Sequence, residues 1–585
     1  MPRCLSIVLA SALLATVAGR PAAAVWSANP AQNLAIADRA SDQVIPLVAA
    51  TPDGGVYVAW FDGFGGSFKV YLQRLNAAGA EQWPHNGVLI SSHPQNSALF
   101  GWDMIADSQG NAVLVFSDIR SGGDLDIYAY KVSPAGVELW GADGVTLSDN
   151  ADFEPAPRVV EASDGDFVFV WQRDPTTGDG DIRMQRLAPD GAPRFGLNGI
   201  AAVASAGEDP GFALLATADN GSVILAWLRN IRSFSSLRHL RAQKFSPAGA
   251  GVWPAFTSVY DAFSLPIGYF PQLQPDAAGG AVLAWHRSDG TLIASFVQHL
   301  SASGAELFPH NGVAVSTTAG MHHVDPSLVT VPGSGDALVF WNERNSTQSQ
   351  WGIFGQRVTA AATRGWGEGG RQLLPVDTTS KSFPHGVPHA GGAMVLLTQQ
   401  ALGSDQLIAM RLDGAGNFVW PGSVVTVSSA PSTKARYPVT IGNAVAKVVW
   451  EDNRSGNVDV YAQDVNADGT LGLLPFPGDV GNSLRLGKSA VTPGSLVLSW
   501  AASCSNGAVD YAIYEGTLAA FGSHVKLDCM DDGADLREEI VPGAGNRYYL
   551  LVPLSATDEG SYGGRPVPAA PDRCLASQAL GTCPQ

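Results

Sequence analysis

Short apolar strands recur along this chain at a nearly constant spacing. They begin at residues 56, 112, 167, 223, 281, 337, 393 and 446, with the sequences VYVAW, AVLVF, FVFVW, VILAW, AVLAW, ALVFW, AMVLL and AKVVW. A polar, Gly-rich turn such as Asp53-Gly54-Gly55 precedes the strand, and a second strand with alternating polarity, such as DIYAYKV or DVYAQDV, follows it. Strand, turn and alternating strand in this order predict a hairpin in each repeat.

Each repeat has material for about four strands. After the hairpin come a turn and an aromatic-then-Gly segment that leads to a third strand, as in WPHNGVLIS and FPHNGVAVS. The stretch before the next apolar strand supplies the fourth. Because no helical periodicity intervenes, the repeats predict an all-β fold, with an eight-bladed β-propeller over residues 25–475.

The two ends of the predicted propeller complement each other. The eighth repeat lacks the aromatic-Gly strand, whereas residues 25–38, VWSANPAQNLAIAD, look like an orphan copy of it. We therefore expect residues near Asn33 to Ala37 to pair with the strand around Val458 to Asp464 and close the ring. An open solenoid is the alternative.

The eighth repeat contains the motif W-x-D-x-R-x-G-x-x-D-[IV]-Y-A, from Trp450 to Ala462. The second repeat matches it loosely from Phe116 to Tyr128. Over roughly residues 25–475 the chain resembles the TolB-like (WD40-like) propeller repeats, in which a strand, an Asp-Arg-Gly turn and a D-I-Y strand succeed each other. The resemblance implies an architecture. The repeats of this chain are longer than those of that group, so no binding partner is carried over from it.

A different module follows a Pro/Gly-rich linker at residues 476–483. Residues 484–565 contain the alternating segments GSLVLSWAASC, VDYAIYEG and NRYYLLVPLSA. With Trp500 in an early strand and Tyr548-Tyr549 in a late one, this part resembles a fibronectin type III-like domain, which implies a small β-sandwich. Residues 566–585 are expected to form a C-terminal disulfide loop.

The N-terminus and the cysteines predict export. Residues 1–24 contain Arg3, an apolar run and a small-residue end, which is typical of a signal peptide. Four cysteines lie in the last part of the chain, and such a set in an exported protein indicates disulfides. Of three pairings we favour Cys504–Cys529 and Cys574–Cys583. We expect a secreted protein, whether extracellular, periplasmic or at the cell surface, without membrane insertion.

The charge balance limits the classes of partner that the protein can bind. With 35 Lys and Arg against 53 Asp and Glu, the formal charge is −18, so the phosphate backbone of a nucleic acid is excluded as a partner. Neither a G-x-S-x-G nucleophile motif nor an H-E-x-x-H metal motif occurs. His85 and His310 occupy equivalent P-H-N-G turns and are interpreted as structural.

The loops after the apolar strands differ between repeats. Four carry an aspartate, whereas Arg229, Arg287, Arg344 and Gln399 mark the others. The acidic residues are Asp62, Asp118, Asp174 and Asp452. One interpretation is a local staple in which the aspartate caps its turn and pairs with an arginine two residues on. The other is an acidic arc on one side of the ring that binds calcium, the one cofactor that the sequence indicates, or a cationic ligand.

The favoured function is a non-enzymatic binding or scaffold protein, a monomer that presents loops to an extracellular glycan or protein. The alternative is an extracellular carbohydrate-active enzyme with carboxylates contributed by several blades, which leave no linear motif. A purely structural spacer is a third hypothesis. Carboxylates that converge ~5 to 10 Å apart in a deep pocket would favour hydrolysis, and mutually paired side chains would favour binding.

Overall fold

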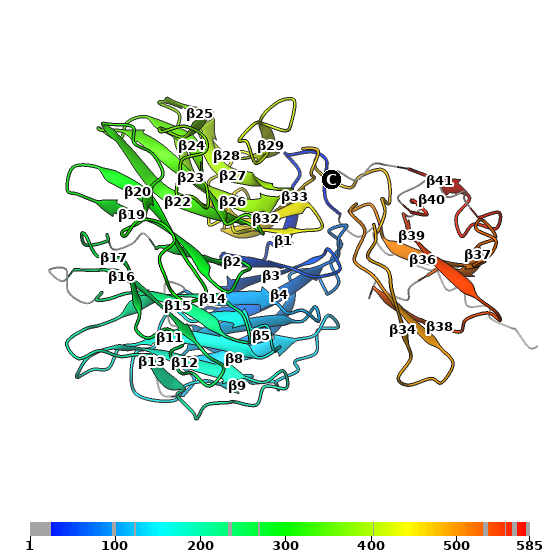
Figure 1. The fold of residues 1–585 in the computed structure, drawn as a ribbon, viewed down its shortest axis with the longest axis horizontal. Helices are drawn as coiled ribbons and strands as arrows, with labels where there is room; N and C mark the ends of the chain where they lie inside the picture. Colours follow the sequence, from blue (N-terminus) through cyan, green and yellow to red (C-terminus); the bar gives the residue numbers. More distant parts are fainter. Residues whose placement is uncertain are drawn as a thin grey trace, which may run out of the picture.

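The computed structural model describes residues 25–580, apart from 96–100, 122–123, 232–236, 267–269, 402, 531–535, 556 and 564–569. The expected signal peptide at 1–24 and Cys583 lie outside the described residues. The fold is all-β, as predicted: a β-propeller is followed by a small β-sandwich (Figure 1). In the part of the chain that the structure describes, no helix has the length and apolarity needed to cross a membrane.

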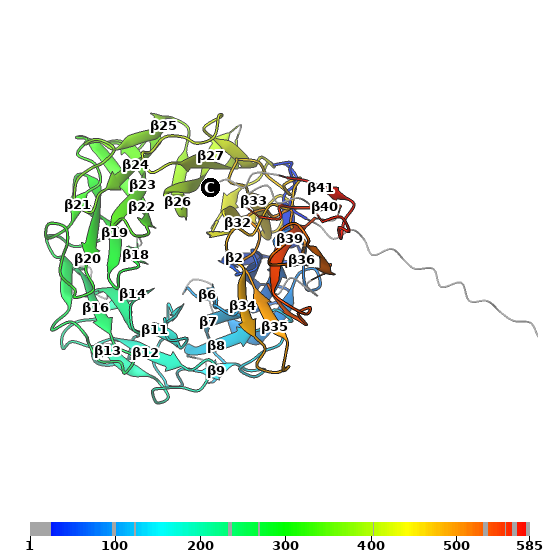
Figure 2. The same cartoon turned by 45° about the vertical axis from the view of Figure 1, so that its right-hand side comes forward.

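Over the described residues, each sequence repeat forms one antiparallel sheet, and successive sheets follow one another around a ring (Figure 2). Seven sheets are continuous in sequence and contain β2–β5 (Gln43–Ala50, Val56–Asp62, Phe68–Leu75, Val88–Gln95), β6–β9 (Asp103–Ala106, Ala112–Asp118, Asp126–Val132, Val145–Thr146), β10–β13 (Arg158–Glu161, Phe167–Arg173, Asp181–Leu187, Ile200–Val203), β14–β17 (Gly211–Thr217, Val223–Leu228, Leu240–Phe245, Thr257–Tyr260), β18–β21 (Gln272–Pro275, Ala281–Ser288, Ile293–Leu300, Val313–Ala314), β22–β25 (Met321–Val331, Asp336–Asn345, Trp351–Val358, Arg371–Asp377) and β26–β29 (Lys381–His389, Gly392–Ala401, Ser404–Leu412, Val425–Ser428). The first strand of each sheet lies nearest the centre of the ring.

The eighth sheet is built from both ends of the propeller, which confirms the predicted closure. It contains β30 (Lys434–Ala435), β31 (Val439–Gly442), β32 (Val445–Asp452) and β33 (Asp459–Val465), and its outer strand is β1 (Leu34–Ala37). In the register of this pair, Leu34 lies opposite Ala462 and Ala35 opposite Tyr461. The alternative of an open solenoid is therefore wrong.

The uninterrupted apolar runs arise because each sheet is packed on both faces. In β3, Val56, Val58 and Trp60 pack against the eighth sheet. The alternate residues Tyr57 and Phe61 pack in the opposite direction, against the second sheet. Neighbouring residues of a strand point to opposite faces, so a strand between two sheets must be apolar at every position.

The aromatic-Gly segments link each sheet to the next. The ring of Trp83 covers Gly136 in the following repeat, and its indole donates a hydrogen bond to the carbonyl of Pro134. The same aromatic-on-glycine contact recurs for Trp140 on Gly191, Phe195 on Gly249, Trp253 on Gly304, Trp366 on Gly416 and Trp420 on Gly469. At the closure Trp26 takes this place on Gly79, where any side chain would collide with the indole ring.

The C-terminal module is a sandwich of two sheets. One contains β34 (Arg485–Lys488), β35 (Leu496–Ser499) and β38 (Arg537–Ile540). The other contains β36 (Asp510–Thr517), β37 (Val525–Asp528), β39 (Arg547–Leu554), β40 (Asp558–Glu559) and β41 (Ser577–Gln578). Leu498 of the first sheet and Trp500, which follows β35, pack against Tyr511, Ile513 and Leu551 of the second sheet.

The sandwich is attached to one face of the propeller. Its buried residue Asn506 donates hydrogen bonds to the carboxylate of Asp464, at 2.7 Å, and to the carbonyl of Gly472, at 3.1 Å. A second carboxylate oxygen of Asp464 accepts the amide of Gly472 at 2.8 Å. Sandwich residues also line cavities together with the turns at 51–55 and 108–110, at the far ends of the inner strands β2 and β6. The opposite face of the propeller carries the starts of the inner strands.

The disulfide pairing predicted from sequence is wrong. Cys529 is bonded to Cys574, which joins the end of β37 to the segment before β41. Cys504 is disulfide-bonded as well, so its partner is neither of these two residues. The prediction failed because it paired neighbours along the chain, whereas a sandwich brings distant segments together.

Candidate functional site

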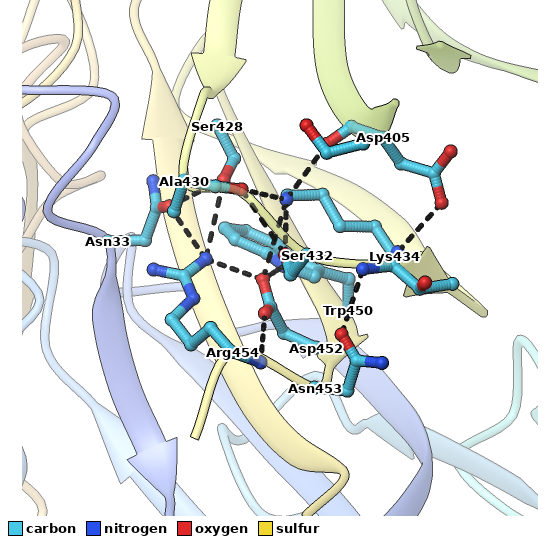
Figure 3. A network of polar contacts seen from close by, with 12 residues as sticks. Asn33, Asp405, Ser428, Ala430, Ser432, Lys434, Trp450, Asp452, Asn453 and Arg454 are labelled. Atoms are coloured by element: carbon cyan, nitrogen blue, oxygen red, sulfur yellow. Dashed lines mark hydrogen bonds and ion pairs between the residues drawn. The ribbon is translucent and has the colours of Figure 1, made fainter. Parts of the chain in front are cut away.

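Asp452, one of the predicted acidic candidates, lies in a dense polar network (Figure 3). Its carboxylate accepts hydrogen bonds from the Trp450 indole at 2.9 Å and from the backbone amide of Arg454 at 3.0 Å. The guanidinium of Arg454 binds the same carboxylate, and the ammonium of Lys434 lies 3.7 Å away. Burial raises the pKa of Asp452, but the contacts with Arg454 and Trp450 outweigh it and hold that pKa below its ordinary value. The carboxylate therefore acts as a staple within its sheet.

Two other predicted candidates also serve as staples. Asp118 accepts the backbone amide of Arg120 at 3.0 Å and pairs with its guanidinium, which lies over the Tyr128 ring. Asp62 accepts the Trp60 indole at 3.2 Å and the amide of Phe64 at 2.9 Å. The sequence offers no arginine two residues after Asp62, and Arg39 approaches it instead, at 3.7 Å.

Asp174 is not equivalent to the other three candidates. Strand pairing places Arg173, opposite Asp181, at the position where Asp62, Asp118 and Asp452 stand. In the sixth repeat that position holds Glu343, which accepts the Trp341 indole at 2.6 Å. The acidic residues at this position therefore do not come from four consecutive sheets, and the expected arc is wrong because Asp174 does not hold the equivalent position. Among the described residues, no group of three or more His, Cys, Asp or Glu side chains could hold a metal ion.

The two histidines of the P-H-N-G turns each contact two carboxylates. The ring nitrogens of His85 lie 2.9 Å from Glu81 and 3.0 Å from Asp38, and hydrogen bonding to Glu81 raises the pKa of His85 to about 9. His310 has the same two kinds of neighbours, Glu306 and Asp261. His385 and His389 both lie in β26 rather than in a helix, as the intervening Gly386 and Pro388 indicate.

A different set of residues marks the face opposite the sandwich. The inner strands contain a bulge at which one residue has a positive φ, and the bulge recurs at the same place in the repeat. These residues are Ile45, Gly101, Ala156, Phe212, Asp325, Phe383 and Arg436. Phe270, two residues before Gln272, holds the corresponding place in the fifth repeat. A bulky residue in the left-handed region is strained, and such strain is concentrated at functional sites.

A cavity of about 470 Å³ lies beside the bulges of the fifth, sixth and seventh sheets, and we call it the imidazole cavity. It is lined by Phe270, Pro271, Gln272, His286, Asp325, Pro326, Phe383, Pro384 and His385. The side chains of Phe270 and Phe383 are 58 % and 52 % exposed. Phe212 extends the aromatic row, because its ring packs edge-on against Phe270 with centroids 4.7 Å apart.

Burial shifts the pKa values of the ionisable groups of the imidazole cavity towards the neutral forms. Burial lowers the pKa of both His286 and His385 to about 4, so the imidazoles are neutral at pH 7. Burial also raises the pKa of the Asp325 carboxyl, and Arg344 lies 3.6 Å from it. The Nδ1 atom of His286 accepts the backbone amide of Asp325 at 3.2 Å, which ties the imidazole to the bulge.

A second cavity of about 470 Å³, which we call the amide cavity, shares Phe383 with the imidazole cavity. It is lined by Ser380, Ser382, Phe383, Thr398, Gln399, Gln400, Asp405, Lys434, Ala435, Arg436 and Tyr437. The hydroxyl of Tyr437 lies 2.8 Å and 2.9 Å from the carbonyl oxygens of Ser382 and Phe383. Asp325 is the carboxylate of the first cavity and Asp405 that of the second, so neither is lined by two carboxylates.

The sequence interpretation missed both cavities. A signal was present, because a proline follows the bulge position in several repeats, in Ile45-Pro46, Ala156-Pro157, Asp325-Pro326 and Phe383-Pro384. Proline restricts the residue before it and recurs here with the period of the repeat. That recurrence marks the bulges, but it does not indicate which of them border a cavity.

No family model and no curated protein matches the sequence. Among solved structures, a polysaccharide lyase, Uly1, is 12 % identical over 78 % of this chain and 94 % of its own, with a TM-score of 0.40. An α-L-arabinanase from Penicillium chrysogenum in complex with arabinobiose is 11 % identical over 58 % of this chain and 99 % of its own, with a TM-score of 0.33. An α-L-arabinofuranosidase from Fusarium graminearum is 11 % identical over 54 % and 93 %, with a TM-score of 0.31. At these values none of the three activities is transferred to this chain.

Proposed function

We propose that this protein binds a polysaccharide at the imidazole cavity, on the propeller face opposite the sandwich. The observation that carries the proposal is the pair of half-exposed rings of Phe270 and Phe383 on either side of a cavity lined with hydrogen-bonding groups. Binding pockets combine aromatic walls with a few polar groups that fix orientation. A sugar ring presents apolar C–H faces and a rim of hydroxyl groups, and both parts have matching groups here.

Rigidity supports the same proposal. The φ of Phe383 is 50°, and strand pairing shifts register at this bulge between Ser382 and His385. Because the Tyr437 hydroxyl bonds the local carbonyl oxygens, the backbone that carries the Phe383 ring is held in place before any ligand arrives. Preorganisation of this kind lowers the entropic cost of binding.

The rest of the chain suits an exported binding protein. The Cys529–Cys574 disulfide is typical of proteins that fold outside the reducing cytosol. The sandwich occupies the other propeller face and leaves the cavity uncovered. The order β34-β35-β38 facing β37-β36-β39-β40 supports a fibronectin type III-like role as a spacer.

Catalysis on the same polysaccharide is the second candidate function. His286 and His385 line one cavity and are neutral at pH 7, because burial lowers the pKa of each to about 4. The Nδ1 atom of His286 already accepts the Asp325 amide, so His385 is the candidate proton acceptor, although its low pKa makes it a weak base. The absence of a second carboxylate in the cavity lining disfavours the two-carboxylate hydrolysis expected of most glycosidases. An elimination at a uronate unit needs a base that removes the C5 proton and a proton donor for the oxygen that leaves when the C4–O bond breaks, so this candidate requires an acidic polymer such as polygalacturonate.

Binding is tested with the full chain in affinity electrophoresis against arabinan, xylan, β-glucan and polygalacturonate. We expect retardation by at least one of these polymers, and Phe270→Ala and Phe383→Ala should each weaken it by about tenfold. Phe521→Ala, which truncates a phenylalanine exposed on the sandwich, is the matched control. Retardation that both cavity variants retain would overturn the site, and the absence of retardation by all four polymers would overturn the proposal.

Catalysis is tested on the retained polymer by following reducing ends and unsaturated products over time. If the second candidate is right, products form and His385→Gln abolishes them while retardation persists. If the polymer is bound but stays intact, the protein is a binding protein.

A further inference from the structure

We infer that the imidazole and amide cavities are two subsites of one groove, and that the groove takes an uncharged linear polysaccharide along its length. This inference rests on the proposed function, which it extends from one cavity to two. Phe383 lines both cavities, so a chain that stacks on its ring from one side reaches the other subsite directly. The groove would run from Phe270 in the fifth repeat to Arg436 before the eighth apolar strand.

The amide cavity has the chemistry of a hydroxyl-binding subsite. Most of its lining side chains are hydroxyls and amides, and Gln400 is exposed at the end of β27. The backbone amide of Gln400 bonds the carbonyl of Ser380, which fixes the residue on the sheet and leaves its side chain to face solvent. Alternating donors and acceptors of this kind match the hydroxyl groups of a sugar unit.

The cations of the amide cavity already have partners. The ammonium of Lys434 bonds the carbonyl oxygens of Asp405 and Ala430, at 3.0 Å and 2.7 Å, and the Ser432 hydroxyl (Figure 3). These contacts use all three of its donors. The guanidinium of Arg436 binds both oxygens of Glu451, at 2.9 Å and 2.8 Å. Both positive charges thus already lie beside carboxylates of the protein, Asp452 for Lys434 and Glu451 for Arg436, which disfavours an acidic sugar at this subsite.

The imidazole cavity also favours an uncharged ligand. Its histidines are neutral at pH 7, and its carboxyl group lies beside Arg344. The formal charge of −18 on the whole chain would also repel a polyanion. The two cavities together thus favour an uncharged polymer over one rich in uronate or sulfate groups.

The test uses size-separated oligosaccharides of roughly one to eight units, prepared from the polysaccharide retained in the binding screen, with the full chain in calorimetry. We expect affinity to rise by about tenfold between two units and a length that fills both cavities, and then to level off. Borohydride reduction of the longest oligosaccharide should leave its affinity unchanged, because binding along the chain does not require the chain end.

Two variants separate the subsites. Gln400→Ala should weaken the long oligosaccharides by about fivefold and leave the disaccharide unchanged, whereas Phe270→Ala should weaken both. Gln82→Ala, at an exposed glutamine in the first repeat, is the matched control. Affinity that is independent of length, unaffected by Gln400→Ala or confined to polygalacturonate would overturn the inference and leave the proposed site standing. If Phe270→Ala changes nothing at any length, the proposed function itself fails.

Discussion

The indole of Trp26 donates a hydrogen bond to the carbonyl oxygen of Ala77 at 2.9 Å, across 51 residues of chain. The bond has the same partners, an indole and a turn carbonyl, as the bond from Trp420 to Ala467 at 2.8 Å and that from Trp253 to Ala302 at 2.9 Å. The N-terminal segment therefore supplies the link that the eighth repeat lacks. Closure consists of two parts, the pairing of β1 with β33 and the contact of Trp26 with the first repeat.

Deletion of residues 25–40 should destabilise the propeller and cause aggregation. The deletion exposes the edge of β33 and removes Trp26, whose truncation alone should cost about 3 kcal/mol. Urea unfolding and sedimentation velocity measure the two effects. Trp83→Ala, which breaks the same kind of contact between internal sheets, should lower stability without exposing a strand edge. A deleted chain that unfolds at the wild-type midpoint and stays monomeric would contradict this account of closure.

Asp452→Ala should destabilise the protein more than Asp118→Ala. Both staples lose an arginine partner, but Asp452→Ala also removes the carboxylate that lies 3.7 Å from the buried Lys434 ammonium and the acceptor of the Trp450 indole. Removing one partner of a buried ion pair costs roughly 3 to 5 kcal/mol, whereas Asp118→Ala affects neither a lysine nor an indole and should cost about half of that. Chemical denaturation gives both values. Asp143→Ala, at a side chain that is 85 % exposed, is the control.

Millimolar calcium should leave the melting temperature unchanged. A cation that binds only the folded state must raise that temperature, but the oxygens of Asp62, Asp118 and Asp452 already accept protein hydrogen bonds. Differential scanning fluorimetry with and without chelator measures the shift. A calcium-dependent rise that disappears in Asp452→Ala would show that the acidic residues form a cation site after all.

The architecture could be predicted from sequence because equivalent segments of successive repeats can be aligned with one another. A strand that packs between two sheets is apolar at each position, so segments such as VYVAW and AKVVW mark the second strand of every sheet. The assignment of Asp174 failed at single-residue resolution. The sequence gives no sign that Arg173 is the residue opposite Asp181, and the indole of Trp171 instead finds Glu154 from the preceding loop, at 3.0 Å.

The candidate site could not be predicted in the same way. Phe270 and Phe383 differ from other exposed aromatic residues only in where a bulge places them, and the neighbours that make a cavity come from other sheets. The repeats also differ in the hydrogen-bond partners of their indole nitrogens, as Trp227 and Trp285 show. Within the described residues they have no hydrogen-bond acceptor, because Arg229 and Arg287 stand where other repeats place a carboxylate. We find no functional reason for that difference.

Peptide mapping without reductant should recover Cys529 and Cys574 in one linked fragment. The bond closes a loop with a sequence separation of 45, for which the loop-closure model gives a stabilisation of about 4 kcal/mol. The double variant Cys529→Ala, Cys574→Ala should therefore lower the unfolding midpoint of the sandwich and leave that of the propeller nearly unchanged. Recovery of Cys529 linked to Cys504 would restore the local pairing and contradict the structure.

The stability difference between Asp464→Asn and wild type should shift in favour of the variant as pH rises from about 4 to 7. Burial raises the pKa of Asp464 to about 7, although contacts with Gly472 and Lys447 oppose the rise. Because a carboxyl group in the unfolded chain ionises near pH 4, the folded state binds more protons than the unfolded state between these pH values. The contribution of Asp464 is therefore complete below pH 4 and is lost as pH rises through about 7, whereas asparagine does not titrate.

Urea unfolding of both proteins at pH 4, 5.5 and 8 measures the difference, with Asp143→Asn as the exposed control. Lys447, whose pKa is lowered to about 8 by burial, adds the opposite trend above that pH, so the comparison ends there. A difference that stays constant from pH 4 to 8 would mean that the carboxyl group ionises in the folded interface as easily as it does in water, and that the bond from Asn506 holds the sandwich equally at every pH in this range.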